Sequence, residues 1–171
     1  MSDARFIVQR LNAGHDRSGF NCGEPSLDRY LHQQASQDIR RQISAVYVLQ
    51  DDQESCIAGY YTLSATSIQF PDLPESETRK IPRYQSLPAC LLGRLAVDRR
   101  YAGQGMGRRL MLDAIKRSIE MASSLGMIAI VVDAIDDDAV SFYKHFGFRR
   151  FPDESSRRLF LRMSDARRLL D

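Results

Sequence analysis

Hydrophobic positions along this chain follow two spacings, which predict strands and helices in alternation. Continuous or alternating apolar runs rich in β-branched and aromatic residues are typical of strands. Such runs predict strands at residues 5–11, 45–49, 56–68, 91–97, 127–134, 148–151 and 158–163. The run at 127–134 is almost continuously apolar, which is typical of a buried parallel strand. The polar turn at 51–55 makes a hairpin of the two strands beside it.

Apolar residues three or four positions apart predict the helices. The longest such stripe predicts a helix from residue 106 to residue 125, stopped by Gly126, and consists of Met106, Leu110, Ala114, Ser118, Met121 and Leu125. Pro25 and Ser26 open another helix, with Ser26 as its cap. The acidic run at 136–138 predicts the start of a third helix, and Ser164 is expected to cap a terminal one.

Prolines interrupt the segment from residue 71 to residue 88, so we expect a loop or a short broken helix there. The length of this segment is unusual for a plain connection and favours a functional loop. Along the chain the elements follow the order β-α-β-β-β-α-β-α-β-β. This order predicts an α/β (α+β) fold, in which a mixed central sheet has helices on both faces. Because neither a repeat nor a linker interrupts the sequence, we expect residues 1–171 to form a single domain.

The composition fits one globular domain. With 171 residues, of which 43% are hydrophobic and 27% charged, the chain can bury a substantial core. It has no apolar run of about 18 residues and no apolar signal-peptide core near its start, so we expect no membrane partner. Its three cysteines lie far apart, which favours a reducing, cytoplasmic setting over a disulfide framework or a zinc site. The net charge of +2 does not by itself indicate a polyanionic partner.

The most informative stretch joins the strand at 91–97 to the helix that follows it. Gly103, Gly105 and Gly107 alternate there, and glycines let the backbone turn tightly and approach a ligand. Free N–H groups and the positive end of the helix dipole then favour an anion such as a diphosphate. A P-loop is excluded because the loop ends in Gly107-Arg108-Arg109, without the required Lys-Ser/Thr. A dinucleotide fingerprint is excluded because Arg108 stands where that motif needs its third glycine.

Two motifs in this chain resemble those of the GNAT N-acetyltransferase superfamily. The run Arg100-x-x-Gly103-x-Gly105, placed between a strand and a helix, resembles the acetyl-CoA loop of that family. The segment 139–148 resembles the GNAT signature in which a tyrosine near the helix start faces the CoA sulfur and an aromatic-Gly-Phe closes the turn. The resemblance covers nearly the whole chain and implies the GNAT fold, with acetyl-CoA as cosubstrate and no metal.

Further segments resemble a narrower group, the GNAT toxins of type II toxin–antitoxin modules. The segments that carry this resemblance are Phe20-x-Cys22-Gly23, Leu27-Asp28-x-Tyr30-Leu31, Ala58-Gly59-Tyr60-Tyr61-Thr62-Leu63 and Gly93-Arg94-Leu95-Ala96-Val97-Asp98. Members of this group acetylate the α-amine of aminoacyl-tRNA and so block translation. The resemblance therefore implies aminoacyl-tRNA as acceptor, a ribbon-helix-helix antitoxin as partner, and a homodimer.

The resemblance also assigns roles to single residues. It places cofactor contacts at Leu95, Ala96, Val97, Arg100, Gly103, Gln104, Gly105, Met106, Gly107, Arg108 and Phe142. Leu95 and Val97 would offer main-chain groups to the pantetheine arm and the thioester carbonyl. Tyr143 is the expected catalytic acid, because a phenol with a pKa of ~10 stays protonated at neutral pH while a thiolate with a pKa of ~8.5 leaves. The alternative for Tyr143 is a core aromatic, although Phe142 and Phe146 could fill the core without it.

No glutamate in the middle strands stands out as a general base. An α-amine with a pKa of ~8 is partly neutral at pH 7, whereas a lysine with a pKa of ~10.4 is not, so a site without a strong base favours an α-amine acceptor. Asp133 or Asp136 could act through water, or could instead end a strand and start a helix. The histidines His15, His32 and His145 show no metal-ligand spacing.

Two groups of basic residues are candidates for binding tRNA phosphates. The predicted nucleic-acid contacts are Arg79, Lys80, Arg83, Arg149 and Arg150, with Arg157 and Arg158 beside the second group. Each group taken singly also fits an ordinary solvated basic surface. Two other functions stay open at this stage. One is a GNAT enzyme that acetylates a small amine or a protein N-terminus, and the other is a regulator that binds CoA without turnover.

Overall fold

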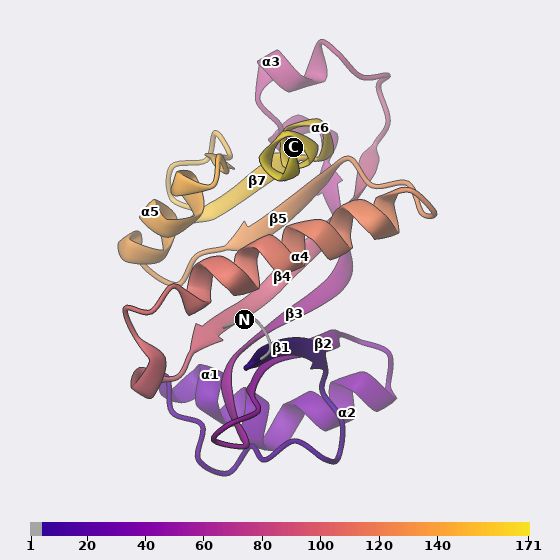
Figure 1. Cartoon of the computed structure of the whole chain (residues 1–171). Helices are drawn as coiled ribbons and strands as arrows, with labels where there is room; N and C mark the ends of the chain where they lie inside the picture. The colour runs from indigo at the N-terminus through magenta and orange to yellow at the C-terminus, as the bar shows by residue number, and fades with distance from the viewer. Residues whose placement is uncertain (1–4) are drawn as a thin grey trace. The chain divides into compact units, whose positions relative to one another are not determined.

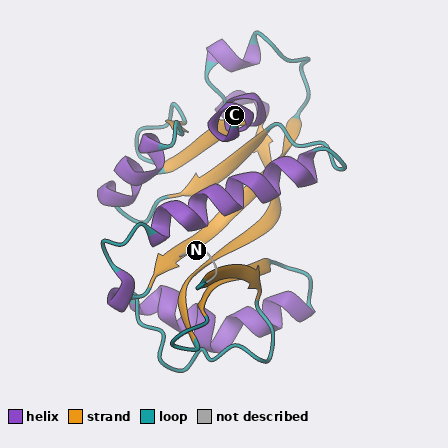
Figure 2. Cartoon of the chain, viewed as in Figure 1, coloured by secondary structure: helices purple, strands orange, loops and turns teal. Residues whose placement is uncertain are grey.

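A computed structural model describes residues 5–171 and contains one mixed sheet. Its strands are β1 (Phe6–Arg10), β2 (Ala45–Asp51), β3 (Cys56–Gln69), β4 (Ser86–Val97), β5 (Ala129–Asp133), β6 (Arg149–Arg150) and β7 (Arg158–Arg162). They are ordered β1-β2-β3-β4-β5-β7-β6, and Figure 2 distinguishes them from the helices. The pairing of β4 with β5 is parallel, whereas β1–β2, β2–β3, β5–β7 and β6–β7 are antiparallel. The predicted mixed α/β sheet is confirmed.

The helical elements follow individual strands, except that β2 leads directly into β3 and β6 into β7. They are α1 (Pro25–Arg29), the π-helix η2 (Tyr30–Gln34), α2 (Ala35–Arg40), the 3₁₀ turn η3 (Phe70–Asp72), α3 (Glu75–Thr78), the 3₁₀ turn η4 (Arg99–Tyr101), α4 (Met106–Ala122), α5 (Asp137–His145) and α6 (Met163–Leu170). The described chain divides into two compact units. The first comprises residues 5–64 and 93–114, and the second comprises residues 65–92 and 115–171. That residues 1–171 form a single domain stays a prediction.

In the first unit, helices cover both faces of the strands (Figure 1). Successive residues of a strand point to opposite faces, and neighbouring tyrosines of β3 illustrate this. Tyr60 belongs to a buried cluster shared with the α1–α2 side. Tyr61 points the other way, and its hydroxyl donates to Asp113 of α4 at 2.5 Å. Gly59 lets α4 approach, because a Cβ there would lie 2.7 Å from Leu110 and 2.8 Å from the carbonyl oxygen of Ala96.

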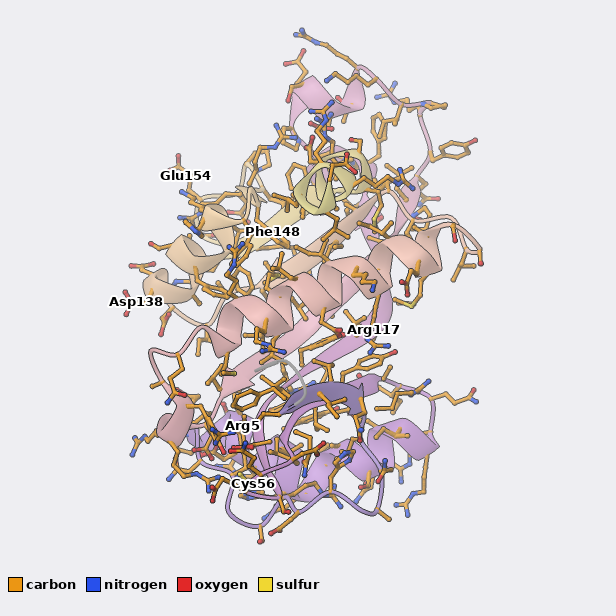
Figure 3. All side chains as sticks on the ribbon, in the orientation of Figure 1. Arg5, Cys56, Arg117, Asp138, Phe148 and Glu154 are labelled. Carbon is orange, nitrogen blue, oxygen red and sulfur yellow. The ribbon has the colours of Figure 1, made fainter. Side chains whose placement is uncertain are left out.

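In the second unit, β4, β5 and β7 also separate two layers of side chains. One face carries a buried cluster formed by Ile68, Leu73, Leu87, Ala89, Ala129, Val131, Phe151 and Phe160. On the other face, Ser118 of α4 donates to the sulfur of Cys90 at 3.8 Å. Phe148, labelled in Figure 3, is buried at the end of the α5 turn and packs on Tyr143 with ring centroids 5.6 Å apart.

The proline-containing segment is more regular than the sequence predicts. It contains the short helix α3, as expected, but β4 begins at Ser86 and so includes Pro88. The strand tolerates this proline because only its carbonyl is used there: it accepts the N–H of Ile128 at 2.9 Å. The expectation of a loop up to residue 88 is therefore wrong for its last three residues.

Two predicted caps and one predicted helix end are also wrong. The helices α1 and α6 begin at Pro25 and Met163, so Ser26 and Ser164 lie inside the first turn instead of capping it. Helix α4 ends at Ala122, and Met121 and Leu125 are 37% and 66% exposed. The apolar stripe is thus buried only in its first part, because α4 extends beyond the strands that it covers (Figure 1).

Candidate active site

The glycine loop lies in the first unit, between β4 and α4. The N–H of Arg109 donates to the carbonyl of Gly105 at 3.1 Å, which is the first bond of the helix. The N–H groups of Met106, Gly107 and Arg108 precede this bond, and the first N–H groups of a helix have no intrahelical acceptor. The start of α4 therefore presents backbone donors at the positive end of its dipole, as an anion site requires.

Two positions in this loop need glycine because of their backbone conformation, and not because a side chain would clash with neighbouring atoms. Gly103 and Gly105 have φ of +74° and +79°, in the left-handed region. A Cβ built at either position would meet no atom within 4 Å. The outer side of the loop is therefore open to a ligand, and the absence of side chains there leaves room for a diphosphate to reach the backbone.

We expect Gly105→Ala to lower the free energy of unfolding by about 1–2 kcal/mol, because alanine is strained at positive φ. Gly126→Ala is the matched control, because position 126 is equally open and has no positive φ. Urea denaturation of both variants checks this expectation. Equal stability of the two variants would contradict it.

The other predicted cofactor residues of the first unit lie in the loop, in the first turn of α4 and on β4, whereas Phe142 lies on α5 in the second unit. Arg100 is already held by a carboxylate: its guanidinium donates to both oxygens of Asp98, at 2.9 and 3.0 Å. Gln104 donates to the carbonyl of Arg100 at 3.2 Å, and Arg108 is exposed. On β4, Ala96 is buried, whereas Leu95 and Val97 are half-buried. Their roles toward a cofactor stay predictions.

A second segment, which the sequence analysis gave no role, holds the start of the loop. Asp98 accepts the N–H of Asn21 at 3.0 Å, and the N–H of Arg99 donates to the carbonyl of Asn21 at 2.9 Å. Gly23 has φ of +93°, and a Cβ there would lie 2.8 Å from the Arg99 guanidinium. The segment Phe20-x-Cys22-Gly23 thus holds the start of the glycine loop by hydrogen bonds. The spacing of this motif in the sequence does not predict these contacts.

Arg94 of β4 also had no assigned role. Its guanidinium lies over the ring of Tyr30, 3.5 Å from the centroid. Tyr30 begins the π-helix η2, and its hydroxyl donates to the buried Asp38 at 2.8 Å. Burial raises the pKa of Tyr30 to about 12, so this donor stays protonated. The signal that could have found Arg94 is its place inside the Gly93–Asp98 motif.

Tyr143 lies in the second unit, on α5. It is 7% exposed and packs against Phe142 with ring centroids 5.4 Å apart. It stands near the end of α5, not near its start as expected. Among residues 5–171 its hydroxyl has no hydrogen-bond acceptor, and burial, helped by the charge of Asp133, raises its pKa to about 12. The hydroxyl therefore carries a proton that the fold does not use elsewhere.

The alternative, in which Tyr143 is only an aromatic residue of the core, depends on whether its neighbours fill the core without it. Phe146 is 5% exposed and belongs to the core, but Phe142 is only half-buried. The expectation that Phe142 and Phe146 fill the core without Tyr143 is wrong, because Tyr143 is itself buried. Burial and catalysis do not exclude each other, and the role of Tyr143 stays a prediction.

The predicted basic residues, all in the second unit, differ in how far they are already paired. Lys80 and Arg83 are exposed, and within the described residues neither makes an ion pair. Arg79 pairs with Glu75 at 3.2 Å, and both side chains are largely exposed. Arg149 forms an ion pair with Glu77, and Arg150 donates to the carbonyls of Glu154 and Ser156 at 3.3 and 2.8 Å. Further along, Arg157 and Arg158 pair with Asp137 and Asp133.

Glu77 contacts one of the predicted tRNA-binding residues, Arg149, and no signal in the sequence indicates this role. It is 7% exposed, and it pairs with Arg149 and with Arg162, the latter at 3.5 Å. It lines a cavity of about 270 Å³ with apolar walls that include Leu73 and Phe160. Glu77 therefore ties the segment that carries Lys80 and Arg83 to β6 and β7.

The structure assigns ordinary roles to the two aspartates considered as bases. Asp133 ends β5 and pairs with Arg158 at 2.9 Å, and Asp136 caps α5 by accepting the N–H of Ala139 at 2.8 Å. Asp138, in the first turn of α5, is exposed (Figure 3). Within residues 5–171 no group of three or more His, Cys, Asp or Glu residues could hold a metal ion. Nor does any helix in this range have the length and apolar character needed to span a bilayer.

Comparison with known proteins decides the family. A family model described as "Acetyltransferase (GNAT) domain" matches residues 42–150. The chain belongs to this family of acetyltransferases. A "tRNA-acetylating toxin" of Mycobacterium tuberculosis is 38% identical to this acetyltransferase over 162 residues, which is 95% of each chain. The predicted GNAT fold is confirmed.

Two solved structures resemble this acetyltransferase over nearly its whole length. One is described as "AtaT complexed with acetyl-methionyl-tRNAfMet". It has a TM-score of 0.89 and 30% identity, and the match covers 97% of this chain and 99% of that one. The other is a mutant AtaT toxin "bound to the C-terminus of the antitoxin AtaR and Acetyl-CoA". It has a TM-score of 0.83 and 26% identity, and the match covers 97% and 98%.

Proposed function

We propose that this acetyltransferase transfers the acetyl group of acetyl-CoA to the α-amine of an aminoacyl-tRNA and thereby acts as a toxin that blocks translation. The observation that carries the proposal is the 38% identity to a tRNA-acetylating toxin across 95% of both chains. The similarity to AtaT, solved with an acetylated aminoacyl-tRNA, supports the same acceptor.

The open glycine loop fits the diphosphate of acetyl-CoA. When bound there, acetyl-CoA supplies an acetyl group activated as a thioester. The N–H groups at the start of α4 would hold the diphosphate, and the lack of side chains at Gly103 and Gly105 gives it access to the backbone. Leu95 and Val97 would orient the acyl end through their main-chain groups. Because Arg100 is bonded to Asp98, we assign it a supporting role in the loop and assign any direct charge contact to the exposed Arg108.

In the transfer, the C–N bond to the amine forms while the C–S bond of the thioester breaks. The departing sulfur takes the proton of the Tyr143 hydroxyl and leaves as a thiol. The amine gives up one proton to solvent, and solvent returns one proton to the Tyr143 phenolate, so the acid is restored. The raised pKa of Tyr143 keeps this acid protonated throughout the neutral range. Because Asp133 and Asp136 are engaged elsewhere, the chain offers no strong base from these positions, which suits an α-amine that is partly neutral at pH 7.

Among the predicted tRNA contacts, Lys80 and Arg83 are best placed to bind phosphates, because within the described residues both are exposed and neither makes an ion pair. We expect the double variant Lys80→Glu, Arg83→Glu to raise the KM for aminoacyl-tRNA about tenfold, since two phosphate contacts become repulsive. The matched control reverses two exposed arginines at the end of α2, Arg40→Glu with Arg41→Glu. Steady-state acetylation of charged tRNA checks this. An equal effect of both double variants would contradict a local binding surface.

We further propose a ribbon-helix-helix antitoxin as protein partner, a homodimer as the assembly and the cytoplasm as the site of action. The AtaT structure with the C-terminus of AtaR supports an antitoxin partner of some kind. The ribbon-helix-helix class and the homodimer rest on the resemblance to the toxin group. Co-purification with the product of the neighbouring gene, followed by measurement of the mass of each species in solution, tests both.

One experiment tests the central proposal. The protein is incubated with labelled acetyl-CoA and charged tRNA, and with free amino acids, polyamines and an unblocked peptide as competing acceptors. Label on the aminoacyl end of tRNA is the expected result. Label only on a small amine or on the peptide would replace the proposal with the corresponding acceptor, and binding of CoA without any transfer would indicate a regulator. Induced expression is expected to arrest growth, and rescue by the antitoxin is the control.

A further inference from the structure

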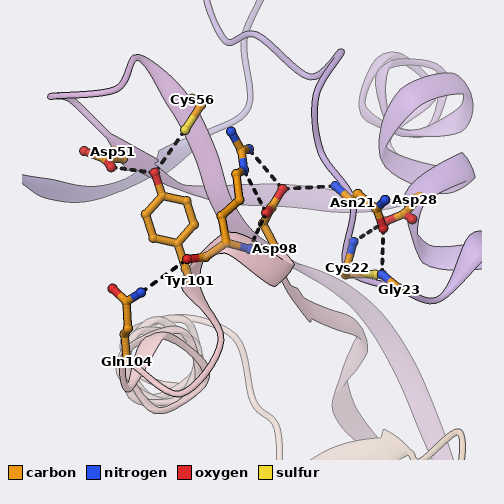
Figure 4. A network of polar contacts seen from close by, with 10 residues as sticks. Asn21, Cys22, Gly23, Asp28, Asp51, Cys56, Asp98, Tyr101 and Gln104 are labelled. Atoms are coloured by element: carbon orange, nitrogen blue, oxygen red, sulfur yellow. Dashed lines mark hydrogen bonds and ion pairs between the residues drawn. The ribbon is translucent and has the colours of Figure 1, made fainter.

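The glycine loop rests on a buried tyrosine that has no predicted role. Tyr101 ends η4, two residues before Gly103, and is 6% exposed. Its hydroxyl donates to Asp51 at 2.5 Å, and the sulfur of Cys56 lies 3.1 Å from the same hydroxyl (Figure 4). The tyrosine thus connects the loop to the end of β2 and the start of β3, within the first unit.

Asp51 is a fixed acceptor. It is fully buried at the end of β2, and it accepts both ends of the Arg5 guanidinium, at 2.9 and 2.7 Å. It also accepts the N–H groups of Gln53 and Glu54, at 3.0 and 3.4 Å. The bond from Arg5 and these further donors hold the pKa of Asp51 well below its usual range. Burial and the neighbouring carboxylate raise the pKa of Tyr101, so this hydrogen bond persists at neutral pH.

The loop is held at three points on its inner side. Asp98 fixes its start, and Tyr101 fixes its middle through Asp51. At its end, the guanidinium of Arg109 lies over the ring of Phe6, 5.6 Å from the centroid, and Phe6 also packs edge-on against Tyr101 at 5.9 Å. A Cβ built at Gly103 or at Gly105 would meet no atom within 4 Å, so no side chain packs on that side of the loop. The contacts of Asp98, Tyr101 and Arg109 therefore hold the backbone donors of the loop from one side.

We infer that Asp51 and Tyr101 act as a positioning pair, which holds the N–H groups of the glycine loop in place for the diphosphate of acetyl-CoA without touching it. The inference rests on the proposed function only in taking acetyl-CoA as the loop's ligand. It does not depend on which acceptor receives the acetyl group. If the pair had only a structural role, its removal would lower stability. It would then impair the use of acetyl donors with and without a diphosphate to the same extent.

The test uses Tyr101→Phe, which keeps the ring packing and leaves Asp51 bonded to Arg5, Gln53 and Glu54. We expect the KM for acetyl-CoA to rise about tenfold, because a hydrogen bond to a charged group is lost. The kcat should stay within about twofold, and the KM for the acceptor should not change. Calorimetric titration with CoA alone should show the same loss of affinity. This measurement tests the inference even if aminoacyl-tRNA proves not to be the acceptor.

Acetyl-pantetheine, a donor without the diphosphate, distinguishes positioning from general damage. Wild type and Tyr101→Phe should use it equally well. Tyr60→Phe is the matched control, because it removes another buried tyrosine hydroxyl of the same unit, bonded to the carbonyl of Leu27 at 2.6 Å, and its affinity for CoA should stay at the wild-type value. Asp51→Asn should weaken CoA binding in the same direction as Tyr101→Phe. The inference is overturned if CoA affinity is unchanged in Tyr101→Phe, if both donors weaken equally, or if the variant loses its cooperative thermal transition.

Discussion

Replacing Tyr143 by phenylalanine is expected to lower kcat by about 10²- to 10⁴-fold, the range that a positioned general acid contributes. Only the hydroxyl is removed, and among the described residues it has no acceptor, so packing against Phe142 and Phe148 is kept. The dissociation constant of CoA should therefore change little. Single-turnover acetyl transfer measures the chemical step, and calorimetric titration measures CoA binding.

The pH dependence gives an independent check on the same residue. A phenol donates only in its protonated form, which is the form below its pKa. Because burial raises the pKa of Tyr143 to about 12, kcat should show no fall from this group between pH 7 and pH 10. Tyr84→Phe removes the hydroxyl of a tyrosine that is 59% exposed and serves as the control, with unchanged kcat. If kcat falls by less than about threefold in Tyr143→Phe, Tyr143 is excluded as the general acid.

The second large effect is expected for Asp98→Ala. Asp98 is 1% exposed, caps the turn η4 by accepting the N–H of Arg100 at 2.9 Å, and also accepts the N–H of Asn21. Loss of a cap and of a buried acceptor should together cost about 3 kcal/mol of unfolding free energy. For a chain of this length that corresponds to a fall in Tm of roughly 6–12 °C. Differential scanning calorimetry measures it.

The acid side of the stability profile tests the same carboxylate. Although burial opposes it, the hydrogen bonds from Arg100 and Asn21 lower the pKa of Asp98. A carboxylate with a lowered pKa stabilises the fold above its unfolded pKa of ~3.9, and this contribution is lost as the pH falls further. The difference in Tm between wild type and Asp98→Ala should therefore become smaller below about pH 4. Asp137→Ala, at a surface pair, is the control and should change Tm by less than about 2 °C; an equal loss in both variants would contradict the assigned role.

The parts of the site that could be predicted are those that one short stretch specifies. Gly103 and Gly105 need positive φ before a helix, and the residues between β4 and α4 contain that requirement. The supports of the loop depend instead on distant partners. Tyr101 and Asp51 are 50 residues apart, and Asn21 and Asp98 are 77 apart. No local pattern encodes such a pair, because either side chain alone has many possible partners.

Some predicted ends of helices and strands are wrong for a related reason. Ser26 and Ser164 have the right chemistry for caps, but the preceding residues Pro25 and Met163 already adopt helical conformation. Pro88 is unfavourable in a strand by itself, and pairing with residue 128 overrides that preference. In each case a neighbour in space or in the chain decided between two locally acceptable states.

The ion pairs of Glu77 have a consequence for how tRNA binding should depend on salt. Each cation that neutralises a phosphate releases condensed counterions, and the steepness of the salt dependence reports how many take part. Arg149 already has its charge compensated by Glu77, and Arg79 pairs with Glu75. A nucleic acid docking on this surface would gain little from displacing those carboxylates. The slope of affinity against salt concentration should thus be shallower than the number of predicted basic contacts implies, and among those contacts should reflect mainly Lys80 and Arg83.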